Sequence, residues 1–257
     1  MLWYKSWLDT RWRFLIGFFI LLVMACGTLF DYLATMKLMP LAKSIDVSSE
    51  LGRRLKETIE IEREFRGFVW VQWFRQNLSQ VGTLFAILIG SGGLLSRTSG
   101  AALFTLSLPV TRRELLGSRA ATGLAELLAL AVVPSLVIPL AAPAVGQSYS
   151  LADSLVHGGC MFAAAAVFFS LAVLLSTMFD DLWRPLLIAC AVAFVIATIE
   201  LVLGDAVTLR TFGIFHVMSA ESYFRSGSIP WLGLLTMSLA AAGMLFAATV
   251  SIAQRDF

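Results

Sequence analysis

Six runs of apolar residues, each long enough to cross a lipid bilayer, constrain the fold of this chain more than any other feature. They occupy residues 13–36, 78–96, 120–142, 153–177, 185–204 and 230–252. A membrane-spanning helix needs about 17–25 such residues, and the short alternating strands of a membrane barrel are absent from the sequence. The runs predict an all-α, polytopic membrane protein: a six-helix transmembrane bundle with both termini on one side.

Composition supports a membrane location. Hydrophobic residues make up 58% of the 257 residues and charged residues 14%, whereas soluble domains contain roughly 45–50% and about 25%. A soluble domain of this length cannot bury so much apolar surface, so the surplus is expected to face lipid. The formal net charge of +2 is too small to indicate a nucleic-acid partner.

The three cysteines indicate neither a disulfide framework nor a metal site. Cys26, Cys160 and Cys190 each lie inside an apolar run, without a partner at metal-ligand spacing. We interpret them as small hydrophobic side chains in packing positions, and we predict no metal and no cofactor.

The beginning of the chain resembles a signal peptide in one respect, because residues 14–30 form an uninterrupted apolar core. The preceding segment, however, is long and rich in tryptophan, and many more spans follow. These features favour an uncleaved first span.

Residues 37–77 separate the first two runs and differ from both. Between Lys43 and Arg66 there are six acidic and six basic residues, several of them in i,i+4 pairs such as Glu50 with Arg54. This pattern predicts an amphipathic helix outside the bilayer, with a solvated charged face and no catalytic role. Five aromatic residues close to its end are expected at the membrane–water interface: Phe65, Phe68, Trp70, Trp73 and Phe74.

Small residues and prolines mark two of the runs. The Gly-Ser-Gly-Gly stretch at 90–93 permits close helix approach or local unwinding, and we favour close approach. Pro134, Pro139 and Pro143 crowd the end of the third run, which predicts a kinked helix or an earlier helix end.

Positive charges alone do not decide which side the termini face, because their numbers on the two sides are nearly equal in a six-span topology. Arg11 and Arg13 directly precede the first run, whereas the basic residues of 37–77 are neutralised by acidic neighbours. We therefore expect the termini in the cytoplasm.

The loop at 97–119, between the second and third runs, contains the most specific motif: residues 105–116 read TLSLPVTRRELL. Pro109 breaks any helix that would run through the loop. Thr111 and Glu114 have the spacing of a capping box at the start of the next helix. Arg112 and Arg113 offer a cationic surface for an acidic protein groove or for lipid phosphate, although two arginines at a helix start are also ordinary topology determinants.

This motif resembles the LSLPVSRR-x-L segment of bacterial permeases of the type-2 class of ABC exporters. Residues 3–13 are similar to the interfacial connecting helix of that class, which implies an interfacial helix over 1–12. The six spans, the outer loop at 205–229 and the short charged tail agree with its layout. The resemblance implies that residues 1–257 form one permease domain in the cytoplasmic membrane of a prokaryote.

The resemblance also implies a mechanism. Two permease subunits, identical or different, pair in the membrane, and each rests on a separate ATPase subunit whose closure is passed upward through the 97–119 loop. The residues expected to contact the ATPase are Leu106, Ser107, Leu108, Pro109, Val110, Thr111, Arg112, Arg113 and Glu114. The sequence contains no G-x-x-x-x-G-K-[ST] phosphate loop, so we expect ATP hydrolysis on another chain. The sequence does not indicate the substrate.

Two rival functions stay open. Ser91 with His157 or His216 has the residue types of a Ser–His hydrolase, but Ser91 is expected near the inner surface and both histidines near the outer one. The second rival is a carrier not driven by ATP, or a scaffold, although the internal repeat typical of carriers is not evident.

Glu126 is the best candidate for a functional polar site within the membrane. It lies about two turns into the third run, where a charged side chain costs roughly 2.5–3.5 kcal/mol. A structural hydrogen bond to a neighbouring helix is an equally good interpretation.

Overall fold

The computed structural model describes residues 2–38, 56, 58–92, 111–179, 181–203 and 211–254, which are almost entirely helical and contain no strand. Within these ranges, five helices are long and apolar enough to cross a membrane. They are α1 (Leu2–Leu38), α6 (Arg112–Ala141), α7 (Leu151–Met178), α8 (Trp183–Leu203) and α12 (Trp231–Gln254). The prediction of an all-α membrane protein is confirmed.

The second predicted span, 78–96, overlaps only the second half of a composite helix, which begins thirteen residues earlier, within the segment 37–77 that was predicted to lie outside the bilayer. This helix consists of α3 (Phe65–Val69), a π-helix η2 (Trp70–Leu78) and α4 (Ser79–Gly90), which follow one another without a break. Because it is divided in this way, it does not count among the five long helices. Its last turn ends at Gly90, six residues before the predicted end.

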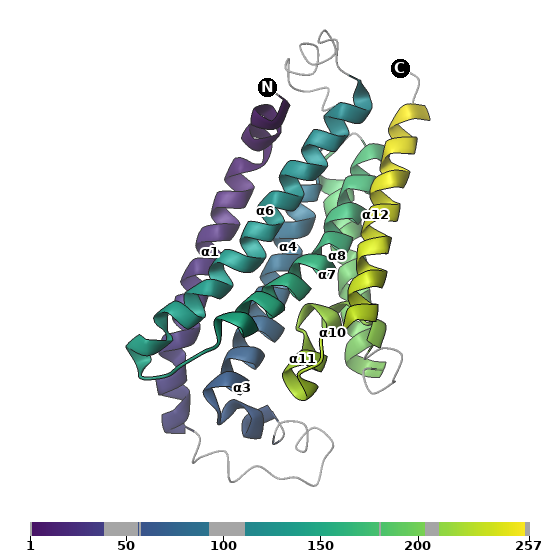
Figure 1. Ribbon diagram of the computed structural model, residues 1–257. Coiled ribbons are helices and arrows are strands. Elements are labelled where there is room, and N and C mark those ends of the chain that lie inside the picture. Colours follow the sequence, from purple (N-terminus) through teal and green to yellow (C-terminus); the bar gives the residue numbers. More distant parts are fainter. Residues whose placement is uncertain are drawn as a thin grey trace.

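The helices form an elongated bundle (Figure 1). The beginnings of α1 and α6 and the end of α12 lie at one end of the bundle, called here the termini end. The short helices α10 (Ile214–Met218) and α11 (Glu221–Ser226) lie near α3 toward the opposite end, called here the hairpin end.

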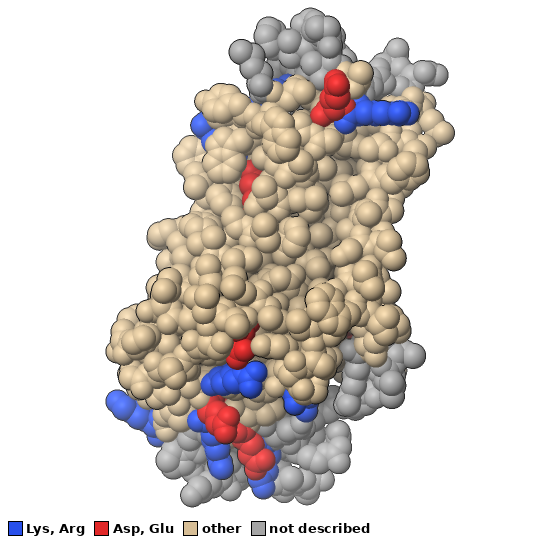
Figure 2. Space-filling model, in the orientation of Figure 1, with Lys and Arg blue, Asp and Glu red and all other residues tan. Residues whose placement is uncertain are grey.

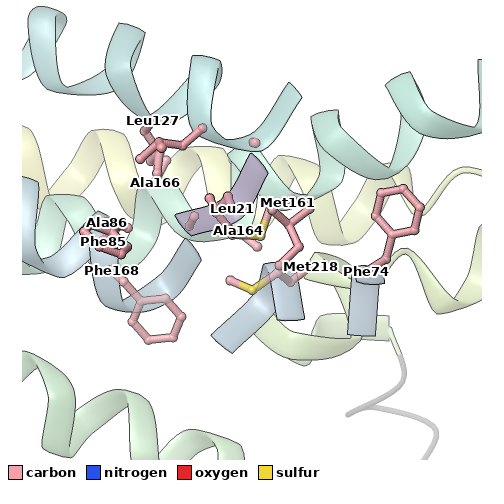
Figure 3. Packing of buried hydrophobic residues seen from close by; sticks show 14 of the residues in the cluster. Leu21, Phe74, Phe85, Ala86, Leu127, Met161, Ala164, Ala166, Phe168 and Met218 are labelled. Carbon is pink, nitrogen blue, oxygen red and sulfur yellow. The ribbon is translucent and has the colours of Figure 1, made fainter. Parts of the chain in front are cut away.

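The centre of the bundle is α7, which packs against α4, α6, α8, α10 and α12. Within its most apolar 18 residues, 67% are buried, compared with 17% to 33% in the other four long helices. The core around it combines side chains from most of the described helices, and Figure 3 shows several of them: Leu21, Phe85, Leu127, Phe168 and Met218.

The outer surface is apolar over most of its height. Figure 2 shows Lys, Arg, Asp and Glu gathered near the two ends of one face, with a broad belt between them in which charged side chains are sparse. Large apolar side chains such as Phe194, Leu239 and Phe246 are at least 70% exposed. Such a surface is stable only in contact with lipid, which makes this a membrane-embedded protein.

The five aromatic residues expected at the membrane interface are buried inside the protein instead. Phe65, Phe68, Trp70, Trp73 and Phe74 are at most 6% exposed. The reason is that α1, α6, α7 and α11 surround this part of the composite helix. Tyr32, for example, packs edge-on against both Phe65 and Phe68. These side chains therefore contact protein rather than lipid.

The proline-rich end of α6 does not end early. The helix continues through Pro134 and Pro139 to Ala141 and passes into a 3₁₀-helix, η3 (Ala142–Val145), which contains Pro143. The N-terminal residues are also not separated from the first span, because α1 is one continuous helix of 37 residues.

Several predicted features lie outside the described residues. These are most of the helix expected over 43–66, the motif residues Leu106, Ser107, Leu108, Pro109 and Val110, the first part of the 205–229 loop, and the charged tail. Residues 58–62, which are described, are helical.

Candidate functional site

The helix that follows the motif begins with the predicted capping box. The Thr111 hydroxyl accepts a hydrogen bond from the backbone N–H of Glu114 at 3.3 Å, and the Glu114 carboxylate accepts one from the backbone N–H of Thr111 at 3.1 Å. These two bonds satisfy N–H groups that a helix start otherwise leaves unpaired. The backbone of Arg112 begins α6, and Arg113 is exposed in its first turn. The start of α6 is therefore fixed by its own sequence.

One face of α1 carries three polar residues that connect it to the neighbouring helices. Ser6, Thr10 and Arg13 lie at i, i+4 and i+7, so they share a face. Ser6 lies 3.4 Å, hydroxyl to hydroxyl, from Ser118 of α6, and Thr10 donates a 2.5 Å hydrogen bond to Glu126 of the same helix. The polar face of α1 thus holds the first half of α6.

The same face also holds the end of α4. The guanidinium of Arg13 donates hydrogen bonds to the backbone carbonyls of Leu88, at 2.9 Å, and of Ser91. Carbonyls in the last turn of a helix have no partner within the helix and carry partial negative charge. Arg13 satisfies them and fixes the point where the chain leaves α4 toward the motif loop.

The two readings of the 90–93 stretch apply to different glycines. A methyl group on Gly90 would stand 2.6 Å from the Phe169 carbonyl oxygen and 2.9 Å from Cβ of Ala172, so this glycine permits close contact between α4 and α7. Gly92 has φ +150°, which favours glycine, and lies just beyond the end of the helix. Gly90 therefore allows close helix packing, and Gly92, two residues later, allows the chain to leave the helix.

Arg119 of α6 reaches this junction as well. A methyl group on Gly92 would lie 2.5 Å from Nη2 of Arg119 and 3.2 Å from Nη1 of Arg13. The two guanidinium groups are thus within about 6 Å of each other, a separation at which like charges repel unless anions lie nearby. Asp9 and Glu126 are close enough to offset the two positive charges.

Glu126 makes the structural hydrogen bond that was one of its two predicted roles. It is 4% exposed; Oε1 accepts the bond from Thr10, while Oε2 has no partner among the residues the structure describes. The sequence could not have identified Thr10 as the partner, because the two residues are 116 positions apart.

A second polar cluster lies at the hairpin end, around Asp153 of α7. Its carboxylate pairs with Arg66 at 3.1 Å and accepts a 2.8 Å hydrogen bond from the Tyr223 hydroxyl of α11. That hydrogen bond raises the pKa of the Tyr223 phenol, with burial as a further cause. Burial, together with the nearby Asp153 charge, also raises the pKa of Tyr149. Asp153 thereby joins α3, α7 and α11.

An aromatic stack holds α11 from the other side. The Phe224 ring lies parallel to Trp70 with 4.4 Å between ring centroids. Arg66 lies over Phe224 at 5.6 Å, and Arg75 lies over Trp70 at 5.6 Å. Each cation is attracted to the negative face of its ring. Sequence reasoning missed this contact, because it assigned Trp70 to the membrane surface.

Glu200 is a further functional group that sequence reasoning did not place inside the protein. It is 5% exposed near the end of α8. Its carboxylate accepts hydrogen bonds from the backbone N–H groups of Phe215 and His216, and it lies 3.1 Å from Nδ1 of His216. Glu200 thus anchors α10 to α8.

The residues of the suggested Ser–His hydrolase are not brought together. Ser91 follows the end of α4, whereas the His157 ring stacks on Phe74, 4.3 Å between centroids, at the far end of the composite helix. About 17 helical residues separate these levels, or roughly 20–25 Å, and proton transfer needs about 3 Å. His216 contacts Glu200 and Glu221.

Within the described ranges, no group of three His, Cys, Asp or Glu residues is placed to hold a metal ion. Cys26, Cys160 and Cys190 are free thiols.

The fold and its two polar clusters define a helical, membrane-embedded bundle. No family model matches the chain, and neither a curated protein nor a solved structure is found to be similar to it. What this bundle does must therefore be argued from its own residues.

Proposed function

We propose that this chain is the membrane-spanning permease subunit of an ABC exporter, and that ATP is hydrolysed by a separate ATPase subunit. The observation that carries the proposal is the attachment of both helices that flank the motif loop to one face of α1. Arg13 holds the end of α4, and Thr10 and Ser6 hold α6. A force applied to the loop would therefore reach α1, α4 and α6 together.

The sequence motif supplies the other half of the argument. Residues 105–116 resemble the loop of type-2 ABC permeases that rests on the ATPase, and the capping box gives this loop a fixed connection to α6. Rigid elements transmit displacement, whereas frayed helix ends absorb it. The motif and the capped helix start agree with a coupling role for residues 106–114.

We further propose that the composite helix is the sixth span. Its 26 residues, from Phe65 to Gly90, amount to about 35–39 Å, which exceeds the roughly 30 Å of a hydrocarbon core. It is shielded by protein on most sides, and this explains its irregular backbone, because π-helical turns are tolerated where neighbouring helices cover them.

The charges on α1 and α6 suggest where the bilayer lies. Residues 14–30 of α1 and 127–141 of α6 contain no charged side chain. At about 55 Å, α1 exceeds the hydrocarbon thickness, so residues 2–13 of α1 and residues 112–126 of α6 stand at or beyond one membrane surface. We assign this surface to the cytoplasm of a prokaryote, where two ATPase subunits would meet a pair of permease subunits.

The test reverses the two charges at the start of α6. In the assembled complex, Arg112→Glu together with Arg113→Glu should weaken ATPase binding or uncouple transport from hydrolysis, since like-charge contacts at an interface cost several kcal/mol. The measurements are the amount of ATPase that co-purifies and the ATP hydrolysed per transport event.

The control replaces the same residues by glutamine. In both variants, a cysteine introduced at position 57 reports topology through its labelling by a membrane-impermeant maleimide added to intact cells. Normal ATP-coupled transport by the glutamate variant, at normal membrane levels and with unchanged labelling, would remove the loop from the mechanism. The arginines would then be topology determinants only, as a carrier or scaffold would require.

A further inference from the structure

Both histidines of the chain contact the same short segment, residues 214–226, which contains α10 and α11. His157 of α7 lies 3.1 Å, through Nδ1, from the backbone carbonyl of Ser219. His216, within α10, lies between Glu200 and Glu221. The segment is thus held by both imidazole rings, one packed against it from α7 and one within it.

The hydrogen bond to Ser219 fixes the tautomer of His157. A carbonyl oxygen only accepts hydrogen bonds, so Nδ1 must carry the hydrogen. The same carbonyl also accepts a 2.9 Å bond from the Trp70 indole. Nε2 therefore carries the lone pair in neutral His157. The side chain is fully buried, and Nε2 has no partner within the described residues.

A proton on Nε2 of His157 finds no hydrogen-bond acceptor within the described residues. Phe74 of η2 stacks on the ring, and Tyr223 of α11 meets it edge-on. The nearest anion, Asp153 on the same helix, already pairs with Arg66 of α3 and with the Tyr223 hydroxyl. Tyr149, which precedes α7, stacks on the same Phe74 ring with 6.5 Å between centroids. A proton on Nε2 would place a buried charge without an acceptor, which is costly.

The docked segment is also under local strain. Ala220, between α10 and α11, has φ +50° in the left-handed region, which non-glycine residues rarely adopt. The hydroxyls of Tyr149 and Ser154 are buried without a partner in the part of the chain that is described. Release of the segment would allow Ala220 to leave its strained backbone conformation. It would also let water reach the Tyr149 hydroxyl, the Ser154 hydroxyl and Nε2 of His157.

From this geometry we propose that His157 is an acid-sensitive latch. Neutral His157 holds residues 214–226 against α7 and η2, and protonation of Nε2 releases them. Because the released state binds the additional proton, the docked state is favoured as pH rises and is lost as pH falls.

His216, unlike His157, faces anions. Its two ring nitrogens lie 3.1 Å from a carboxylate oxygen of Glu200 and 3.6 Å from one of Glu221. A proton on His216 would be attracted by both carboxylates and would hold the segment more tightly. Arg225 pairs with Glu221 at 2.8 Å.

The test is amide hydrogen exchange of residues 214–226 in the full-length protein in nanodiscs, between about pH 7 and pH 4, a range that spans the titration of a buried histidine. The variant His157→Asn can still donate to Ser219 but does not titrate. Intrinsic exchange rates cancel when the two proteins are compared at one pH. We expect similar exchange at neutral pH and, at the acid end, exchange in the wild type about tenfold faster than in the variant.

His216→Gln is the matched control, and it should retain the acid-dependent increase because His157 is intact. An acid-dependent loss of protection that persists in His157→Asn would overturn the proposal. It would point to His216 if it disappears in His216→Gln, and to Glu200 or Glu221 if it persists in that variant as well. The wild type alone is also decisive, should the asparagine variant fail to fold: once its exchange rates are corrected for the intrinsic pH dependence of amide exchange, protection of residues 214–226 that does not fall in acid excludes the latch. None of these outcomes depends on an ATPase.

Discussion

Thr10 and Glu126 are 116 positions apart in sequence, yet they share a 2.5 Å hydrogen bond. Bonds of this kind are not predictable from one sequence, because nothing local in either helix specifies the partner. The capping box of Thr111 and Glu114 is the opposite case: its two members are three residues apart, their geometry is dictated by the helix start, and the predicted bonds are present. A hydrogen bond is therefore predictable from the sequence when its two residues lie a few positions apart, and not when they lie on helices far apart in the chain.

Thr10→Val tests the bond between α1 and α6. It preserves the shape of the side chain but leaves the Glu126 carboxylate without a partner, which should lower the free energy of unfolding by about 1–3 kcal/mol. The control is Thr198→Val, because Thr198 is exposed on α8 and bonds only within its own helix. It should change stability by less than about 0.5 kcal/mol. Equal effects in thermal unfolding would show that the Thr10 bond contributes nothing.

At the scale of elements, hydropathy predicted five helices to within a few residues at most ends, since an apolar run of about 20 residues has few alternatives in a membrane. The exceptions have physical causes. α1 begins at Leu2, well before the apolar run, because a helix does not need lipid contact to form, and the residues that precede the run continue the same helix. The composite helix carries its tryptophans inward because other helices surround it, and hydropathy does not distinguish lipid from protein as the apolar environment. The short helices α10 and α11 are too small to leave a periodic signal.

Two tryptophans distinguish burial in protein from contact with lipid. Trp70 is fully buried, stacks on Phe224 and bonds to Ser219, whereas Trp183 is 66% exposed. Trp70→Ala should destabilise the protein by about 3–5 kcal/mol. Trp183→Ala should cost less than about 1 kcal/mol, because lipid replaces the lost contacts. Thermal unfolding in one detergent gives both changes in stability. A small loss of stability for Trp70→Ala would show that Trp70 contacts lipid rather than the protein interior.

At the scale of the whole molecule, the bundle has different polar chemistry at its two ends. The termini end contains hydrogen bonds and opposed charges that tie α1 to α4 and α6. The hairpin end contains histidines, carboxylates and an aromatic stack that hold a short segment in place. Between them, the packed core around α7 connects the two ends mechanically. Such a division agrees with the proposed export function, in which an ATPase acts at one end of the bundle.

ATP hydrolysis, measured on the chain alone and on the complex in which it is isolated from its own cells, tests the central claim most directly. We expect the chain alone in nanodiscs to hydrolyse no ATP, because its sequence has no phosphate loop. We also expect the native complex to contain an ATP-binding subunit in equal amount, and hydrolysis to cease when this subunit is removed. Turnover by the chain free of other subunits, or transport driven by an ion gradient without ATP, would contradict the proposed function.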